Sequence, residues 1–162
     1  CFVAFGRDLF NEHRKWVAQL ESLVAARQLQ PCFRWIRDLD AAEQILPALD
    51  ILLHHALQEP FGRVICEAQA CEVPVVAADS GGPASIIRQG VTGVLVRDGD
   101  APAMAAEALS LLSDPARAAA LAKAGRSLVL EQFTTRHVCE RLAAEYRAAF
   151  AEEKPAAFAD DG

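Results

Sequence analysis

Short apolar runs alternate with amphipathic stretches along the first hundred residues. The apolar runs predict strands over 1–5, 32–36, 50–54, 74–78 and 94–96. The stretches between them have apolar positions at helical spacing and predict helices over 11–29, 41–49, 61–71 and 83–89. This alternation is typical of parallel strands joined by crossover helices. We therefore expect a three-layer α/β domain with a mostly parallel sheet. The run 74–78 is apolar throughout, as expected of a strand covered on both faces.

Local signals set the expected ends of several helices. Pro31 follows the first helix, and Asp40 is a candidate N-cap for 41–49. Pro47 should end or kink that helix early. Gly90 is expected to stop the helix over 83–89.

The pattern changes after Asp100, where only helices are expected. Alanines and leucines over 103–112 predict one helix, and Asp114 followed by a proline opens a second. A third helix spans 134–150, with apolar side chains at four-residue steps. Residues 151–162 are acidic and contain Pro155, which predicts a frayed or disordered tail. We thus expect one domain over 1–150.

Composition restricts the class of partner. The chain has 162 residues, 52% of them apolar, and a net charge of −6, which is typical of a globular protein. A net negative charge argues against nucleic acid or an anionic membrane as the main partner. It leaves room for a local phosphate site built from backbone N–H groups.

The five cysteines and the chain ends point to a cytoplasmic piece of a longer chain. The cysteine count is odd, with neither Cys-x-x-Cys spacing nor flanking histidine pairs, so we expect free thiols and no zinc site. No apolar run reaches the length of a membrane span, and no signal peptide is expected. Cys1 is followed at once by a predicted strand, which disfavours a lipidated cysteine and favours a truncated chain.

Ligands of open parallel sheets bind at the carboxyl ends of the strands. Three loops leave such ends here, over 37–40, 54–60 and 79–82. The second runs into a helix expected to begin near Phe61, whose first N–H groups lack partners within the helix. Gly62 allows a ligand close to the backbone, and the positive end of the helix dipole favours a phosphate.

Two glutamates extend this candidate phosphate site. Glu67 lies on the same helix with its side chain leaning toward the N-terminus, where a carboxylate suits the hydroxyls of a ribose. Glu59 precedes the helix and would face a group on the distal phosphate. The arrangement predicts a site for a nucleotide-diphosphate sugar. The simpler reading of Glu67 is a solvated ion pair with Arg63, four residues away. His54 and His55 are interpreted as a strand end rather than as catalytic groups.

Several motifs together carry a family resemblance. A frame of Glu, seven residues and Glu spans 59–67 around a Phe-Gly pair, and Val73-Pro74-Val75-Val76, Gly81-Gly82 and residues 90–96 follow it in order. This combination closely resembles the retaining glycosyltransferases of the GT-B fold, family four (glycosyl transferases group 1). The resemblance covers residues 1–150.

The resemblance implies a Rossmann-like, donor-binding C-terminal half of a two-domain GT-B enzyme. It implies that Glu59 is catalytic and contacts the transferred sugar, and that Glu67 binds the ribose. The other positions it assigns to the donor substrate are Phe61, Gly62, Arg63, Val64, Gly81, Gly82, Arg37 and Leu39. No metal or other cofactor is implied, because helix N–H groups and basic side chains carry the phosphate charge.

The chain also departs from the family pattern. Arg37 and Glu72 stand where the family usually has glycine, and Ser85 where an acidic residue is common. The resemblance also implies a first strand and helix with diphosphate-binding Arg and Lys, and an N-terminal acceptor domain, which are not found in these 162 residues; we therefore expect a truncated chain.

The expected function is retaining transfer of a sugar from a nucleotide-diphosphate sugar to an unknown acceptor. The isolated chain should bind nucleotide weakly and transfer nothing. The alternatives are a GT-B nucleotide-sugar epimerase and a non-catalytic nucleotide-binding fragment. The sequence leaves the base, the sugar and any membrane association open.

Overall fold

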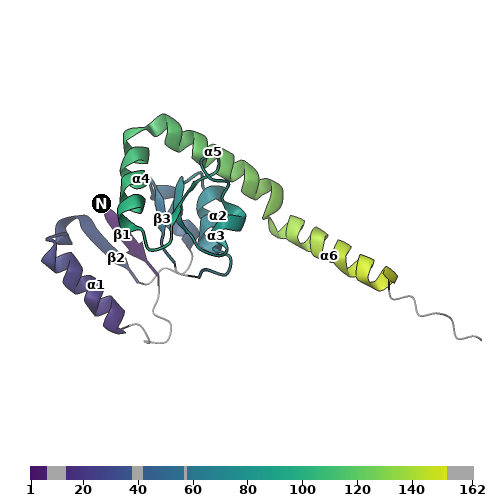
Figure 1. The fold of residues 1–162 in the computed structure, drawn as a ribbon, viewed down its shortest axis with the longest axis horizontal. Helices are drawn as coiled ribbons and strands as arrows, with labels where there is room; N and C mark the ends of the chain where they lie inside the picture. Colours follow the sequence, from purple (N-terminus) through teal and green to yellow (C-terminus); the bar gives the residue numbers. More distant parts are fainter. Residues whose placement is uncertain (7–13, 38–41, 57, 153–162) are drawn as a thin grey trace, which may run out of the picture. The chain divides into compact units, whose positions relative to one another are not determined.

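The computed structural model describes residues 1–6, 14–37, 42–56 and 58–152 (Figure 1). The chain forms two compact units, residues 1–44 and residues 45–162. All strands paired in the described residues are parallel, as the alternation of elements predicts. The sequence-predicted tail over 153–162 lies outside the described residues.

The N-terminal unit contains one pair of strands and one helix. Its elements are β1 (Phe2–Phe5), α1 (Arg14–Ala26), the 3-10 turn η1 (Gln30–Cys32), β2 (Phe33–Ile36) and η2 (Ala42–Gln44). β1 pairs with β2 from Phe2 opposite Phe33 onward, which confirms both predicted strands to within a residue. The predicted helix 11–29 extends too far, because the chain leaves the helix after Ala26 and Gln28 has a left-handed φ of 54°.

The C-terminal unit carries a three-stranded sheet and most of the helices. Its elements are η3 (Leu46–Ala48), β3 (Leu52–His54), α2 (Arg63–Ala70), β4 (Val75–Asp79), α3 (Pro83–Ile86), β5 (Val94–Arg97), α4 (Ala101–Ser113), α5 (Pro115–Gln132) and α6 (Thr135–Glu152). β4 is central, with β3 on one side and β5 on the other.

Both faces of β4 are covered, as its apolar sequence predicts. Its residues from Val75 to Ala78 are fully buried. Val76 packs with Met104 and Leu111 of α4 on one face. Successive side chains of a strand point to opposite faces. Val75 and Ala77 therefore point to the other face of the sheet, and the helices α2 and α3 also contact β4. The unit thus has the helix–sheet–helix layers of a Rossmann-like α/β fold.

Further sequence predictions about helices are corrected. The predicted helix 41–49 is wrong: two 3-10 turns occupy this stretch, and Pro47, which has no N–H group, lies at the start of the second. Asp40 lies outside the described residues. The helix expected near Phe61 begins at Arg63 instead.

The helix predicted over 83–89 ends at Ile86, because a closed loop follows it. In that loop the Arg88 amide donates to Thr92 Oγ1 at 2.9 Å, and the Gly90 amide donates to the Gly93 carbonyl at 2.9 Å. Gly90 therefore serves this loop and does not cap the helix.

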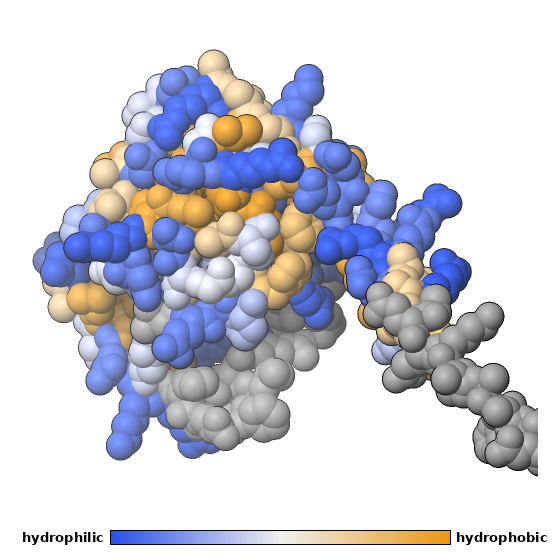
Figure 2. Space-filling model, turned by 45° about the vertical axis from the view of Figure 1, so that its right-hand side comes forward, coloured by the Kyte–Doolittle hydropathy of each residue, from blue (hydrophilic) through white to orange (hydrophobic). Residues whose placement is uncertain are grey.

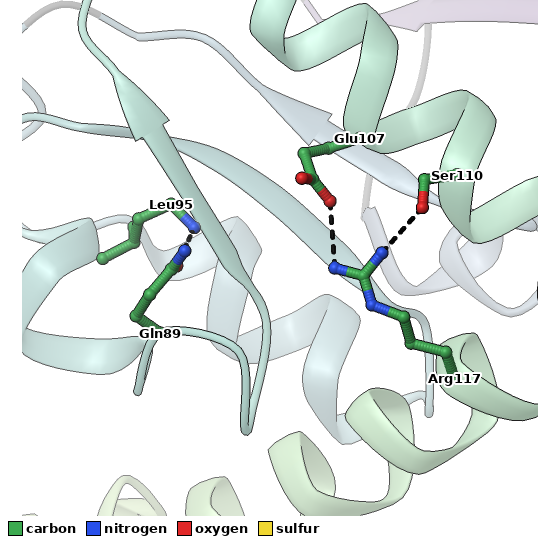
Figure 3. A network of polar contacts seen from close by, with 5 residues as sticks. All are labelled: Gln89, Leu95, Glu107, Ser110 and Arg117. Carbon is green, nitrogen blue, oxygen red and sulfur yellow. Dashed lines mark hydrogen bonds and ion pairs between the residues drawn. The ribbon is translucent and has the colours of Figure 1, made fainter.

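The predicted starts of α4 and α5 are explained by aspartate caps. Asp100 accepts the Ala103 amide and Asp114 accepts the Arg117 amide, both at 3.0 Å. Arg117 also reaches back to α4, at 2.9 Å from Glu107 and 2.8 Å from Ser110 (Figure 3). In the same view Gln89 Oε1 accepts the Leu95 amide at the start of β5. These side chains fix the helices and loops around the sheet.

A buried polar contact fixes α2 against α5. Gln69 of α2 is fully buried, and its Nε2 donates to the Thr92 carbonyl at 2.8 Å. Gly125 of α5 faces this contact, and a Cβ there would lie 3.0 Å from both Gln69 Cγ and the Thr92 carbonyl oxygen. The missing side chain lets α5 approach the helix that carries Glu67.

The last helix confirms the predicted stretch 134–150. Thr134 caps it, its Oγ1 accepting the His137 amide at 3.3 Å. Its apolar side chains at four-residue steps are exposed: Val138, Leu142, Tyr146 and Phe150. Apolar surface also lies among polar side chains on the face of the molecule in Figure 2. Within the described ranges, no helix combines the length and apolar character needed to cross a bilayer.

Glu72 occupies a left-handed position, with φ 57°, and pairs with Arg126 at 3.5 Å. We predict that Glu72→Gly is more stable than Glu72→Ala by about 1 kcal/mol, because alanine is strained at positive φ and glycine is not. Both variants lose the ion pair, so their difference in free energy of unfolding, measured by urea denaturation, isolates the backbone effect. Equal stabilities would contradict this account of Glu72.

Candidate functional site

The loops that follow β3 and β4 meet at the carboxyl edge of the sheet. Glu59 forms a parallel bridge with Gly81, and the Gly82 amide donates to the Glu59 carbonyl at 2.7 Å. One residue earlier, the Gln58 amide donates to Ser80 Oγ at 3.0 Å. The main chain before α2 is therefore held by the loop that follows the central strand.

The Gly81-Gly82 pair makes this close approach possible. A Cβ at Gly82 would lie 2.2 Å from the Phe61 carbonyl oxygen, and one at Gly81 would lie 2.6 Å from the Glu59 carbonyl oxygen. No side chain fits at either distance. The two glycines assigned to the donor site by resemblance thus have a definite structural role, and their contact with substrate stays a prediction.

The N-terminus of α2 is open to an anion. Gly62 turns the chain into the helix with φ 99°, and no side chain caps it. The Ile65 amide is already bonded to the Gly62 carbonyl at 2.9 Å. Among the described residues, nothing accepts a hydrogen bond from the amides of Arg63 and Val64. Two free donors at the positive end of a helix dipole suit a phosphate group.

Glu67 lies four residues into α2, just over one turn from its start. Its Oε1 is 3.2 Å from Arg63 Nη2, so the ion pair expected from their spacing is present. The Arg63 side chain is 86% exposed, so this pair contributes only about 0.3–0.5 kcal/mol. A ligand hydroxyl can displace so weak an interaction.

The Glu59 carboxylate lies beside the start of α2. Its Oε1 accepts a long hydrogen bond from the Phe61 amide at 3.4 Å, and its Oε2 is 3.9 Å from His54 Nε2. The Glu59 side chain keeps 27% of its surface exposed. The carboxylate thus accepts one long hydrogen bond, lies near a histidine ring and is still reachable by a ligand.

His54, the last residue of β3, is largely buried, and its Nδ1 contacts no polar partner within the described residues. Burial lowers the pKa of the imidazole from its ordinary value of 6.5, with partial opposition from the Glu59 carboxylate. Desolvation disfavours the charged form of histidine, so His54 is neutral at pH 7.

A pair of aromatic rings lies at the turn before α2. The ring of Phe61 packs against Phe133 at the end of α5, with centroids 5.9 Å apart. Phe61 remains 40% exposed. The contact connects the turn before α2 to the junction between α5 and α6.

Arg37 and Leu39, which the family resemblance assigns to the donor substrate, belong to the N-terminal unit, more than 15 residues before Glu59 in the chain. Arg37 pairs with Glu21 and lies over the Trp35 ring, 5.2 Å from its centroid. Leu39 lies outside the described residues. The C-terminal unit contains the other predicted site residues, Glu59, Phe61, Gly62, Arg63, Val64, Glu67, Gly81 and Gly82.

The hydrogen bond of Ser80 and the proximity of His54 to Glu59 were not predicted from the sequence. A serine beside a Gly-Gly pair carries no distinctive signal. A polar ring at the carboxyl end of a strand was the available signal for His54.

Other chemistry has little support in the described part of the chain. No group of three or more His, Cys, Asp or Glu residues is arranged there to hold a metal ion. Cys66 is next to Glu67, but burial raises the pKa of its thiol to about 11. At neutral pH it is therefore an inert thiol.

The profile of the family "Glycosyl transferases group 1" matches residues 2–128. The chain belongs to this family of glycosyltransferases.

Two curated relatives illustrate the likeness in sequence. The chain is 37% identical over 122 residues to the alpha-maltose-1-phosphate synthase of Mycolicibacterium smegmatis, covering 70% of this chain and 32% of that protein. It is 42% identical over 111 residues to the D-inositol 3-phosphate glycosyltransferase of Rhodococcus opacus, covering 68% and 24%. The chain thus matches about a third or less of the length of these relatives.

Solved structures show the same fold. HepE of Anabaena in complex with UDP has a TM-score of 0.85 and 26% identity, over 90% of this chain and 40% of that one. Sucrose-phosphate synthase of Thermosynechococcus elongatus has a TM-score of 0.82 and 30% identity, over 93% and 38%.

We predict that Gly82→Ala destabilises the chain by about 2–3 kcal/mol, because the added methyl overlaps the Phe61 backbone. Gly99→Ala is the control. Gly99 has φ 76° but open space around its Cβ position, so this variant should lose only about 1 kcal/mol. Denaturant titrations of both variants test the contact, and a Gly82→Ala variant no less stable than Gly99→Ala would refute it.

The lowered pKa of His54 predicts a pH effect on stability. Between the folded-state pKa and about 6.5, the unfolded chain binds more protons than the folded chain, so stability falls as pH falls through this window. His54→Gln removes this contribution. We expect the free energy of unfolding to fall less between pH 7.5 and 5.5 in this variant than in the wild type. An equal fall in both would show that His54 does not titrate as described.

Proposed function

We propose that this chain is the donor-binding part of a longer glycosyltransferase that moves a sugar from a nucleotide-diphosphate sugar to an acceptor. The observation that carries the proposal is the open N-terminus of α2, flanked by Glu59 and Glu67 at the carboxyl edge of the sheet. Membership of the glycosyl transferases group 1 family supports it, as do the UDP complexes of HepE, a protein with the same fold.

Each part of the donor has a proposed partner. The diphosphate binds the free amides of Arg63 and Val64, which point from the positive end of the helix dipole. Glu67 accepts hydrogen bonds from the ribose hydroxyls once Arg63 releases it. Phe61 and Gly62 line the sugar and diphosphate, and Glu59 contacts the transferred sugar.

The proposed reaction breaks the bond between the anomeric carbon and the diphosphate oxygen. The nucleoside diphosphate leaves with the electron pair, an acceptor hydroxyl forms the new glycosidic bond, and the hydroxyl proton passes to the departing diphosphate. Positive charge develops at the anomeric carbon, so the Glu59 carboxylate stabilises the transition state. We propose that the configuration at this carbon is retained.

We propose that no metal ion is required. Negative charge grows on the departing diphosphate, and the helix amides are fixed donors placed to stabilise it without a cation. Arg37 and Leu39 are proposed to contact the base of the nucleotide, and Gly81-Gly82 to border the donor.

The remainder of the proposed enzyme supplies the acceptor site and further cationic groups for the diphosphate. This chain on its own therefore binds nucleotide weakly and transfers no sugar. A cytoplasmic location is proposed because all five cysteines are free thiols, which persist in a reducing compartment.

We predict that one of UDP, GDP and ADP binds this chain in isothermal titration calorimetry, and that Glu67→Gln weakens its binding about tenfold by removing a charged hydrogen-bond acceptor. The matched control is Glu145→Gln, which removes an exposed carboxylate on α6 and should bind like the wild type. Equal affinity in all three proteins would overturn the role of Glu67, and no binding of any nucleotide would overturn the proposed site.

A further inference from the structure

The position of His54 is unusual for a residue that serves only packing. Its side chain is 11% exposed at the end of β3, where an apolar residue would fill the space without burying polar atoms. Nδ1 has no polar partner among the described residues, and Nε2 lies toward Glu59. Burying an unpaired ring nitrogen costs stability. Among the described residues, the Glu59 carboxylate is a polar group within 4 Å of the ring, with Oε2 3.9 Å from Nε2.

The Oε2 atom of Glu59 is the side of the carboxylate at which a hydrogen-bond donor could hold it in place. The Phe61 amide reaches Oε1 from the helix side, and the hydrogen bond from Gly82 holds the Glu59 main chain. Among the described residues, no hydrogen bond reaches Oε2, and His54 Nε2 lies 3.9 Å from it. This separation is too long for a hydrogen bond, but catalytic contacts often tighten when substrate binds. A neutral imidazole protonated on Nε2 would donate to Oε2 and leave a second lone pair free for a sugar hydroxyl.

We propose that His54 is a positioning residue for Glu59, acting as a neutral hydrogen-bond donor through Nε2. This inference rests on the proposed function, because it assigns a partner to the carboxylate that contacts the sugar. The proposal requires the tautomer in which Nε2 carries the proton and Nδ1 is an unpaired acceptor.

The charge state of His54 then matters to the reaction. The charged groups that face it are Glu59 and, beside it in the chain, His55. A protonated His54 would form an ion pair with Glu59 and reduce the negative charge available to the anomeric carbon. The rate should therefore fall as pH falls through the pKa of His54.

The test uses the full-length protein that carries this chain, with UDP-glucose, GDP-mannose and ADP-glucose as probes. Release of nucleoside diphosphate gives kcat and KM, and calorimetry gives the nucleotide affinity. His54→Ala should lower kcat roughly 10- to 100-fold, the range typical of groups that orient a functional side chain in metal sites. Nucleotide affinity should stay unchanged.

Two substitutions separate positioning from packing. Gln places an amide N–H near the position of Nε2, whereas Asn reaches only as far as Nδ1. His54→Gln should therefore restore most of kcat and abolish its fall at acidic pH, and His54→Asn should not restore it. In a Glu59→Gln background, His54→Ala should add little further loss, because the group that it positions is already changed.

The outcomes distinguish the inference from the function on which it rests. Wild-type protein that binds no nucleotide and turns over no donor overturns both. Intact binding with normal kcat in His54→Ala overturns the inference alone. Independent losses in the double variant, with a lowered Tm in His54→Ala and His54→Gln alike, also overturn it by assigning His54 to packing.

Discussion

The candidate site depends on the hydrogen bond from the Gly82 amide to the Glu59 carbonyl, at 2.7 Å. This bond links the main chain of the loop after β3 directly to the main chain of the loop after the neighbouring strand β4. It forms only because Gly81 and Gly82 lack side chains that would overlap Glu59 and Phe61. The position of the Glu59 carboxylate and the turn into α2 both follow from it. Two glycines therefore determine where a carboxylate and a helix N-terminus meet.

The surrounding packing makes this edge rigid. β4 is buried on both faces and fixes the loop that carries the glycines. The buried, uncharged side chain of Gln69 links α2 to the main chain at Thr92. Gly125 has no side chain, so α5 can pack closely against this contact. A helix held in this way can present its first amides at a fixed place, and fixed donors stabilise developing charge without reorganising.

Much of this arrangement could be predicted from the sequence. The continuous apolar run over 74–78 predicted a strand covered on both faces, and Asp114 followed by a proline predicted the start of α5. The apolar pattern over 61–71 predicted the helix α2, and the Glu59–Glu67 frame drew attention to its start as a candidate site. These features depend on local pattern and on spacing along the chain, which the sequence records directly.

Other features depend on contacts between distant residues. The glycine pair signalled a turn, but its fit against Phe61 required the fold. The helix predicted over 41–49 was wrong because local propensity outweighed Pro47 in the prediction. His54 was interpreted as an ordinary strand end because its proximity to Glu59, five residues later, depends on the fold of the chain. Glu72 stands where the family usually has glycine, and the structure shows that the backbone at Glu72 is still left-handed.

The central claim is that the diphosphate of a nucleotide sugar binds the first amides of α2. The most direct test is the backbone amide NMR spectrum of this chain, titrated with UDP, GDP and ADP. We expect the signals of Arg63 and Val64 to shift most with one nucleotide, while that of Gly99 stays in place. Saturable shifts confined to other regions, or no shift with any of the three, would contradict the account.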